Sequence, residues 1–373
     1  MSGAGSQPDL RQKMDSIRAR VKLSTLIGRV VKLTQKGPDW FGLCPFHTES
    51  TPSFTVNDDK GFYHCFGCQA HGDAMDFLMD HQKLPFGEAL RMLEQDAGIA
   101  GMNLKQREAD RELLERREAK AAADAAERRK SAQGLWYSCM TGAETPADDY
   151  LRGRGIDFGS LGHWPGALKY RGDVPHGDLK RELPAMVSCM IGPDLRSITA
   201  VHRTFLQYRP DTSGVSRWQK LAIEDEEASA KHARRVLHKA KMMLGAKKGA
   251  HIPVWKGRYD VPLHAIPAGT DIYVSEGIED GGAVAMEDPS LRIVAAGDVG
   301  NIGALEVPEQ AGNIVIIAQN DPEGSGGAES FEKAVTKLQE RNRGKRLVQA
   351  IWPPQDVKDF AELRERKMRG VAA

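Results

Sequence analysis

The chain has 373 residues, a formal net charge of +1 and a hydrophobic fraction of 40%. This length exceeds that of one typical domain and predicts two or three domains. The near-zero net charge does not by itself require a nucleic-acid partner, and the apolar content excludes a chain that is disordered throughout. Residues 1–8 lack the apolar core of a signal peptide, and no later stretch approaches the roughly 18 consecutive apolar residues of a membrane span. We therefore expect a cytoplasmic protein with no membrane partner.

Helical periodicity opens the chain and short strands follow it. Apolar residues recur at helical spacing over residues 9–27. Strands are predicted at 30–33, 40–43, 53–56 and 62–64, and helices at 73–79 and 86–96. Between Asp9 and Lys36 there are eight Lys or Arg and two Asp, so this segment attracts phosphates if the cations share one face. Charge alone equally favours an ordinary solvated helix surface.

Four potential metal ligands lie in two pairs within this region. Two residues separate Cys44 from His47 and Cys65 from Cys68, and seventeen residues separate the pairs. Each spacing allows both members of a pair to chelate one ion, and a closed shell of four ligands is typical of structural zinc. Free thiols with a surface histidine are the alternative, which the chelating spacing of both pairs disfavours. We predict a structural Zn²⁺ on which the surrounding strands depend for folding.

Aromatic residues are concentrated around these ligands: Trp40, Phe54, Phe62, Tyr63 and Phe66. Rings on a partly basic sheet can stack unpaired bases. A small domain must also fill its core, so for any single ring a core position is favoured. As a group, the rings can still form a face that contacts single-stranded nucleic acid.

The composition changes after the first hundred residues. Residues 105–130 are rich in Ala, Arg, Glu and Lys, and they can bury little surface, which predicts an exposed helix or tether. A mixed region follows, with strands predicted at 185–191 and 197–206 and a charged insertion at 224–239. The last hundred residues alternate helical stretches with apolar strands, at 272–275, 292–295, 314–318 and 347–351. That alternation predicts an α/β domain with a parallel sheet.

Acidic residues follow two of these strands. Glu276 comes directly after strand 272–275, and Asp321 comes shortly after strand 314–318. Open α/β sheets present ligands at the carboxyl ends of their strands, so the two carboxylates can converge on one cation. Carboxylate oxygens suit Mg²⁺, which can neutralise a triphosphate. For either residue alone, an ordinary acidic loop position would be the simpler interpretation.

Two parts of the chain resemble bacterial DnaG-type primases. The segment 14–99, with its Cys/His and Cys/Cys pairs, is similar to their zinc-binding domain. Residues 269–366 resemble the Toprim domain of primases and topoisomerases, with Glu276 and Gly277 matching its first motif and Asp321 and Gly324 its second. The likeness extends to the compact Toprim primases of phages and mobile elements.

The second Toprim motif departs from the family pattern. Gln319 stands where an aspartate is expected, which replaces one metal ligand with a neutral amide. Asp356 and Asp359 fall where the family has a third acidic motif, and Asp356 can supply the missing charge. Arg203 and Lys241 lie in segments that resemble the basic motifs of the primase core, and they are expected to contact phosphates. For both residues the alternative is an ordinary cation on the protein surface. Lys220 is a weaker candidate for a phosphate contact.

These patterns predict a multidomain α+β protein. The predicted parts are a zinc-ribbon-like template-recognition domain (1–100), a charged helical linker (101–134), the basic part of a primase core (135–268) and an α/β Toprim domain (269–373). The resemblance implies a DNA primase that makes short RNA primers on single-stranded DNA from ribonucleoside triphosphates. Its catalytic ion would be Mg²⁺ or Mn²⁺, and its partner could be a replicative helicase acting in trans.

Two other functions remain open at this point. The first is a catalytically weak or inactive relative of primases that binds single-stranded DNA, which the amide of Gln319 favours. The second is a Toprim nuclease, in which water rather than a hydroxyl attacks the backbone. The zinc-ligand pairs argue against the nuclease, since the resemblance of that segment is to primases.

Overall fold

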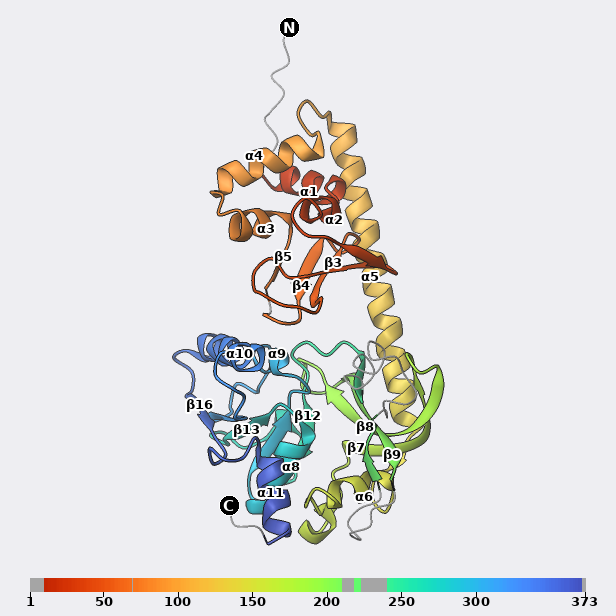
Figure 1. Cartoon of the computed structure of the whole chain (residues 1–373), viewed down its shortest axis with the longest axis vertical. Coiled ribbons are helices and arrows are strands. Elements are labelled where there is room, and N and C mark those ends of the chain that lie inside the picture. Colours follow the sequence, from red (N-terminus) through yellow and green to blue (C-terminus); the bar gives the residue numbers. More distant parts are fainter. Residues whose placement is uncertain (1–9, 69, 210–217, 223–239, 371–373) are drawn as a thin grey trace. The chain divides into compact units, whose positions relative to one another are not determined.

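The computed structural model describes residues 10–68, 70–209, 218–222 and 240–370 (Figure 1). It divides into two compact units, Met1–Asp124 and Ala125–Ala373. The charged insertion predicted at 224–239 lies outside the described residues.

The first unit combines a small antiparallel sheet with four short helices. Its helices are α1 (Leu10–Arg20), α2 (Leu23–Ile27), α3 (Ala74–His81) and α4 (Phe86–Ala97). Its strands are β1 (Thr34–Lys36), β2 (Asp39–Gly42), β3 (Phe54–Asn57), β4 (Phe62–Cys65) and β5 (His71–Gly72), paired in chain order. The side chains of Ile17, Phe54, Tyr63 and Phe77 are buried in its core. The apolar faces of the helices and one face of the sheet therefore share one core.

Two predictions for this unit are wrong. The helix predicted over 9–27 is broken in two, because Lys22 has an extended backbone (φ −79°, ψ 115°) between α1 and α2. The strand predicted at 30–33 is absent, because the N–H groups of Val30 and Val31 both donate to the carbonyl of Ile27. That turn uses the donors which a strand would need, while Val31 is still buried against the core.

Helix α5 (Leu104–Tyr137) begins in the first unit and ends in the second. Near its start, Asp110 accepts a hydrogen bond from Arg20 Nε at 2.9 Å. Near its end, Ala132 and Trp136 are buried in an apolar cluster of the second unit. Each end is thus anchored by contacts that the sequence composition did not reveal.

The second unit contains two sheets. The first is antiparallel, with strands β6 (Met140–Thr141), β7 (Leu168–His176), β8 (Arg181–Ile191), β9 (Ile198–Tyr208), β10 (Trp218–Lys220) and β11 (Lys241–Gly245). Its order is β10-β9-β8-β7-β6, with β11 also paired to β9. Helix α6 (Pro146–Arg152) and a 3-10 turn (Phe158–Leu161) precede β7.

The second sheet has the order β12-β14-β13-β15-β16. Its strands are β12 (Ile252–Trp255), β13 (Ile272–Ser275), β14 (Arg292–Ala295), β15 (Ile314–Ile317) and β16 (Val348–Ile351). All pairs are parallel except β12 with β14. Its helices are α8 (Ile278–Glu287), α9 (Val299–Ile302), α10 (Gly326–Asn342) and α11 (Phe360–Met368), and 3-10 turns lie at Gly257–Tyr259 and Leu263–Ala265.

This topology creates a switch point beside the central strand β13. Helix α8 packs against α11, whereas α9 packs against α10 (Figure 1). The chain leaves β13 toward β14 and then crosses to β15 on the other side. In such sheets the carboxyl ends of the two central strands border a crevice that ligands can enter. The predicted class, a multidomain α+β protein with a mainly parallel C-terminal sheet, is confirmed.

Candidate functional site

The first unit brings the four predicted zinc ligands into one cluster. One donor atom from each of Cys44, His47, Cys65 and Cys68 lies within 4.8 Å of all the others. The Sγ atoms of Cys44 and Cys68 are 3.7 Å apart, and Cys65 Sγ is 3.8 Å from His47 Nδ1. The three cysteines are buried. Three sulfurs and one imidazole nitrogen form the donor set of a closed, tetrahedral zinc site.

A carboxylate holds the backbone and the histidine of this cluster. Glu49 accepts hydrogen bonds from the backbone N–H groups of Cys44 (2.7 Å) and Ser53 (3.1 Å). Its Oε2 lies 3.4 Å from His47 Nε2, while Nδ1 of the same ring faces the sulfurs. A carboxylate on the second nitrogen fixes the tautomer and orientation of a metal-binding histidine. Sequence reasoning missed Glu49, although its position two residues after His47 was a usable signal.

The aromatic residues of this unit divide between core and surface. Phe54 and Tyr63 are buried with ring centroids 5.4 Å apart. Phe62 and Phe66 are exposed, and Phe66 forms an edge contact with His64 at 4.7 Å. The core takes the first pair, whereas Phe62 of β4 and Phe66 just after this strand keep exposed rings. Phe66 is the ring most accessible to a ligand, since 64% of it is exposed.

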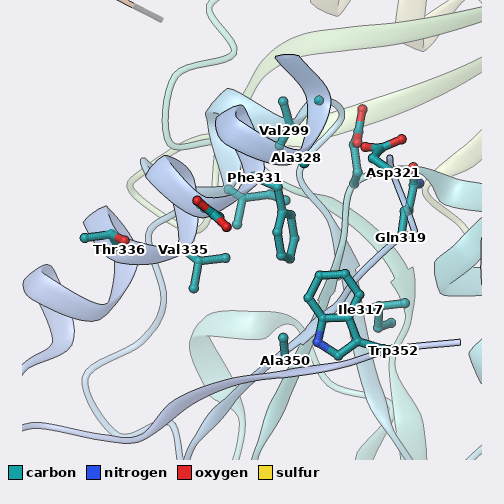
Figure 2. A pocket seen from close by; sticks show the side chains of 14 residues that line it. Val299, Ile317, Gln319, Asp321, Ala328, Phe331, Val335, Thr336, Ala350 and Trp352 are labelled. Atoms are coloured by element: carbon teal, nitrogen blue, oxygen red, sulfur yellow. The ribbon is translucent and has the colours of Figure 1, made fainter. Parts of the chain in front are cut away.

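In the second unit, Glu276 and Asp321 line one cavity of about 590 Å³, together with Gln319. Figure 2 shows Asp321 and Gln319 at one end of this cavity and the rings of Phe331 and Trp352 further along it. Glu276 follows β13 and Asp321 follows β15, which are adjacent parallel strands. The cavity therefore opens at the crevice beside the switch point, and the predicted pair of carboxylates shares it.

The surroundings of Glu276 are unfavourable for an isolated negative charge. Burial is the main cause that raises the pKa of Glu276, against the opposing effect of Lys241, and with the nearby Asp298, Asp280 and Asp321 it brings this pKa to about 7. A nearby cation stabilises the ionised form of such a carboxylate. A divalent cation would provide that charge, so the residues present fit the group that the sequence predicted.

Gln319 occupies a defined position beside these carboxylates. Its Nε2 donates a hydrogen bond to Asp280 Oδ2 at 2.7 Å, and Asp280 Oδ1 accepts from the N–H of Ala361 at 3.1 Å. Burial, and after it the charge of Asp359, raise the pKa of Asp280 to about 6, although the hydrogen bonds from Ala361 and Gln319 act to lower it. The amide thus satisfies a buried carboxyl group, where an aspartate would add another charge.

Lys241 of β11 forms a partly buried ion pair near Glu276. Its Nζ lies 2.9 Å from the carboxylate of Glu279, which also accepts a hydrogen bond from the hydroxyl of Tyr150 at 2.8 Å. Burial alone would raise the pKa of Glu279, but Lys241 more than offsets this and the pKa lies below its ordinary value. The ammonium of Lys241 is thereby fixed in direction. Lys220 interacts electrostatically with both groups, and burial lowers its pKa.

Arg203 lies on β9 next to β11, paired in register with Met242. Its guanidinium donates to the carbonyls of Pro175 and Met243, each at 3.3 Å. Only 9% of the residue is exposed, and burial lowers its pKa. The side chain thus joins two strands by contacts to backbone carbonyls.

The two aspartates of the third acidic segment have different partners. Asp356 is exposed and its Oδ2 lies 2.7 Å from Arg366 Nη1. Asp359 begins α11, where its side chain accepts from the N–H of Glu362, and it interacts electrostatically with Asp280. Neither residue lines the cavity of Glu276 and Asp321.

Three acidic residues near the cavity were not predicted from the sequence. Glu279 and Asp280 occupy the first turn of α8, and Asp298 is the N-cap of α9. For Glu279 and Asp280 the signal was present, because they follow Glu276 by three and four residues at a helix start. Asp298 lies after β14, and only the sheet order brings it near Glu276.

Three family models match separate parts of the chain. Residues 10–109 match the CHC2 zinc finger, residues 126–254 match a domain of unknown function, and residues 271–368 match a Toprim domain. The chain therefore contains one segment similar to a CHC2 zinc finger and another similar to a Toprim domain. Its predicted resemblance to DnaG-type primases is confirmed by these two domains, and the predicted zinc cofactor is supported by the match and by the cluster of four ligands.

The chain is similar to curated DNA primases over part of its length. The chain is 47% identical to the enzyme of Geobacillus stearothermophilus over 88 residues, 24% of this chain and 15% of that one. It is 36% identical to the Salmonella typhimurium enzyme over 154 residues, 38% of this chain and 24% of that one. The matched segments thus span less than a quarter of the length of these relatives.

Solved primase structures superpose poorly on the whole chain. The Aquifex aeolicus primase, with its zinc-binding and RNA polymerase domains, gives a TM-score of 0.36 at 15% identity, covering 96% of this chain and 84% of that one. The primase fragment of the bacteriophage T7 primase-helicase protein gives 0.33 at 13% identity, covering 87% and 92%. TM-scores this low establish no detailed structural correspondence between these proteins and this chain.

Among the residues that the structure describes, none forms a helix long and apolar enough to cross a membrane.

Proposed function

We propose that this protein is a DNA primase that synthesises short RNA primers on a single-stranded DNA template. One observation carries the proposal. Glu276 and Asp321 face the same cavity at the switch point of a Toprim sheet, in a chain that also contains a CHC2 zinc finger. The curated relatives that match part of this chain are DNA primases, which supports the same activity here.

In this proposal Cys44, His47, Cys65 and Cys68 bind a structural Zn²⁺. Their donor atoms are close enough to share one ion, and the ring of His47 is oriented by Glu49. The zinc finger then holds the single-stranded template, with the exposed ring of Phe66 as a stacking surface for an unpaired base.

Glu276 and Asp321 hold the catalytic Mg²⁺ or Mn²⁺ in the second unit. When bound, the ion neutralises the triphosphate and the charge that develops during transfer. The 3′ hydroxyl oxygen attacks the α-phosphorus, and pyrophosphate leaves. Lys241, which is held by Glu279, supplies a fixed positive charge near the phosphates.

Arg203 and the third acidic segment have supporting roles in this proposal. Arg203 positions β11, and therefore Lys241, by bonding the carbonyl of Met243. Asp356 would have to leave Arg366 before it could act as a third carboxylate. Asp359 is the better supported candidate for the third carboxylate, because it already interacts electrostatically with Asp280.

The remaining parts of the prediction are retained as proposals. The chain divides into a template-recognition domain (1–100), a helical linker (101–134), a basic core region (135–268) and a Toprim domain (269–373). Ribonucleoside triphosphates are the substrates, and a replicative helicase acts as a partner in trans. We propose that the chain is similar to the compact primases of phages and mobile elements.

The test is primer synthesis by zinc-loaded protein on mixed-sequence single-stranded DNA, with labelled nucleotides and either Mg²⁺ or Mn²⁺. We expect short template-dependent products, and we expect Glu276→Ala and Asp321→Ala to lower the rate by at least about 100-fold, as for loss of one charge-stabilising group. Glu329→Gln, on the exposed surface of α10, is the matched control that keeps activity.

A binding-only relative of primases is the second candidate. The hydrogen bond from Gln319 to Asp280 favours it, because the amide takes the place of an expected metal ligand. Intact DNA binding without any product under either metal would identify that protein. Metal-dependent cleavage of a labelled strand, lost in the same two variants, would identify a nuclease.

A further inference from the structure

We propose that the cavity beside Glu276 and Asp321 binds the base of a nucleoside triphosphate, with Trp352 as the stacking surface and Glu332 as an acceptor for an exocyclic amino group. This inference rests on the proposed function and names a binding subsite within it. The cavity has one acidic and one apolar end, an exposed indole ring and polar groups at its rim.

The two ends of the cavity differ in chemistry. Glu276, Gln319 and Asp321 form one end, and the remainder is largely apolar, with Ile317, Val335, Phe331 and Trp352 in its lining. Its volume of about 590 Å³ falls within the range of roughly 300–1,000 Å³ typical of small-molecule sites. A nucleoside triphosphate has the same division, since its phosphates require a cation while its base is a flat, weakly polar ring.

Trp352 is unusual for a large ring near a domain core, because 54% of it is exposed. It follows β16 and contacts Phe331 of α10 in an edge-on arrangement, with ring centroids 5.4 Å apart and an interplanar angle of 71°. Figure 2 shows both rings along the cavity. Phe331 therefore supports the indole and leaves part of it uncovered. A base that stacks there would meet a surface that is already ordered.

Polar groups of α10 border the apolar part. Glu332 and Thr336 line the cavity one helical turn apart and are both exposed. The carboxylate of Glu332 is exposed and lines this cavity, so it is available as an acceptor. Carboxylates accept hydrogen bonds from the exocyclic amino groups of bases. Adenine, guanine and cytosine carry such a group, whereas uracil does not.

The direction of binding follows from the charges. The carboxylates repel a bare triphosphate, so the phosphates enter with the divalent cation at Glu276 and Asp321. The base is then left to the apolar part of the same cavity, next to Trp352. A nucleotide in the opposite orientation would place phosphates on an uncharged indole beside Glu332, without a compensating cation among the lining residues.

The experiment measures binding by the full zinc-loaded chain to triphosphate analogues with a methylene group between the α and β phosphorus, in the presence of Mn²⁺. Calorimetry gives the Kd for Trp352→Leu, Trp352→Phe and Glu332→Gln, with Glu329→Gln as the matched control on the same helix. We expect about a tenfold weaker Kd in Trp352→Leu and near-normal binding in Trp352→Phe, which keeps an aromatic ring. Glu332→Gln should reduce the preference for the adenine analogue over the uracil analogue.

Steady-state kinetics separate this inference from the proposed function. The Trp352→Leu variant should raise the KM for nucleotides about tenfold and change kcat less than about twofold. Primer synthesis with an unchanged KM and Kd in that variant would overturn the subsite and leave the primase. Nucleotide binding that depends on Trp352 without any primer synthesis would overturn the primase and leave the subsite. Absence of nucleotide binding by the unmodified chain would overturn the subsite directly.

Discussion

At the scale of single residues, Gln319 stands where the resemblance to primases predicts an aspartate. The amide donates to Asp280, which is only 4% exposed and has a second donor in the N–H of Ala361. An aspartate at position 319 would place a second negative charge against this buried group. Gln319 therefore lowers the repulsion between the carboxylates at the cost of one metal ligand.

Replacing Gln319 by Asp tests this balance. We expect the Gln319→Asp variant to have a lower melting temperature without metal, because its new carboxylate repels Asp280. Mn²⁺ should restore the melting temperature and bind about tenfold more tightly, which corresponds to about 1.4 kcal/mol. Electron paramagnetic resonance titration gives the affinity. Gln319→Leu, which loses the hydrogen bond without adding charge, is the control, and equal Mn²⁺ affinity in all three proteins would contradict the argument.

At the scale of elements, His251 lies at the contact between the two sheets of the second unit. Its backbone forms a bridge with Ile191 at the end of β8, with N···O distances of 2.7 and 2.9 Å, and β12 begins at the next residue. The side chain is 1% exposed, and burial lowers its pKa to about 3. In the folded second unit, the imidazole of His251 is therefore neutral near pH 7.

This histidine makes stability depend on pH. The pKa of His251 is lower in the folded state than in the unfolded state. The contribution of the neutral imidazole to stability is therefore complete above the ordinary histidine pKa of about 6.5, and it is lost as the pH falls toward 3. At pH 5 we expect the free energy of unfolding of the second unit to be lower by about 2 kcal/mol. Urea titrations at several pH values measure the slope. The His251→Asn variant, whatever its absolute stability, should have a smaller slope between pH 6.5 and 5, and an unchanged slope would refute the assignment.

The same scale explains which elements the sequence predicted correctly. Strands β13 and β14 begin and end where the apolar runs predicted, since a buried parallel strand has few competing structures. The region around residue 30 was mispredicted because Val30 and Val31 have high strand propensity, yet their N–H groups complete a turn after α2. Local propensity was overridden there by tertiary packing of Val31.

At the scale of the whole molecule, the chain consists of two compact units with different sources of stability. The first has a small core around the four zinc ligands, and the second has three apolar clusters that include two sheets. A small domain buries too little apolar surface to be very stable alone, so metal binding contributes much of its folding energy.

Removal of zinc should consequently affect the units unequally. We expect a chelator, or the Cys65→Ser variant, to abolish amide protection in β3 and β4 while protection in β13 and β15 persists. Hydrogen exchange followed by mass spectrometry on the full chain measures both regions in one sample. Readdition of Zn²⁺ should restore protection to the unmodified protein only. Loss of protection in both units would mean that they do not fold independently.

Some properties were determined by the sequence alone. The pairs of Cys44 with His47 and Cys65 with Cys68 predicted a zinc site, because chelating spacing is local information. The apolar strands predicted the C-terminal sheet, and the residues after two of them, Glu276 and Asp321, were expected to converge. Each of these inferences depends on neighbours along the chain.

Other properties were decided only by the tertiary structure. The sheet order brings Asp298 near Glu276, and the packing of α8 places Glu279 against Lys241 and Asp280 against Gln319. Arg203, which was expected to contact phosphates, donates instead to backbone carbonyls of β7 and β11, and Trp352 after β16 lines the same cavity as Glu276 and Asp321. The physical reason is that charge environments and cavities arise from residues distant in the chain, whose separations are fixed only when the strands take their order in the sheet.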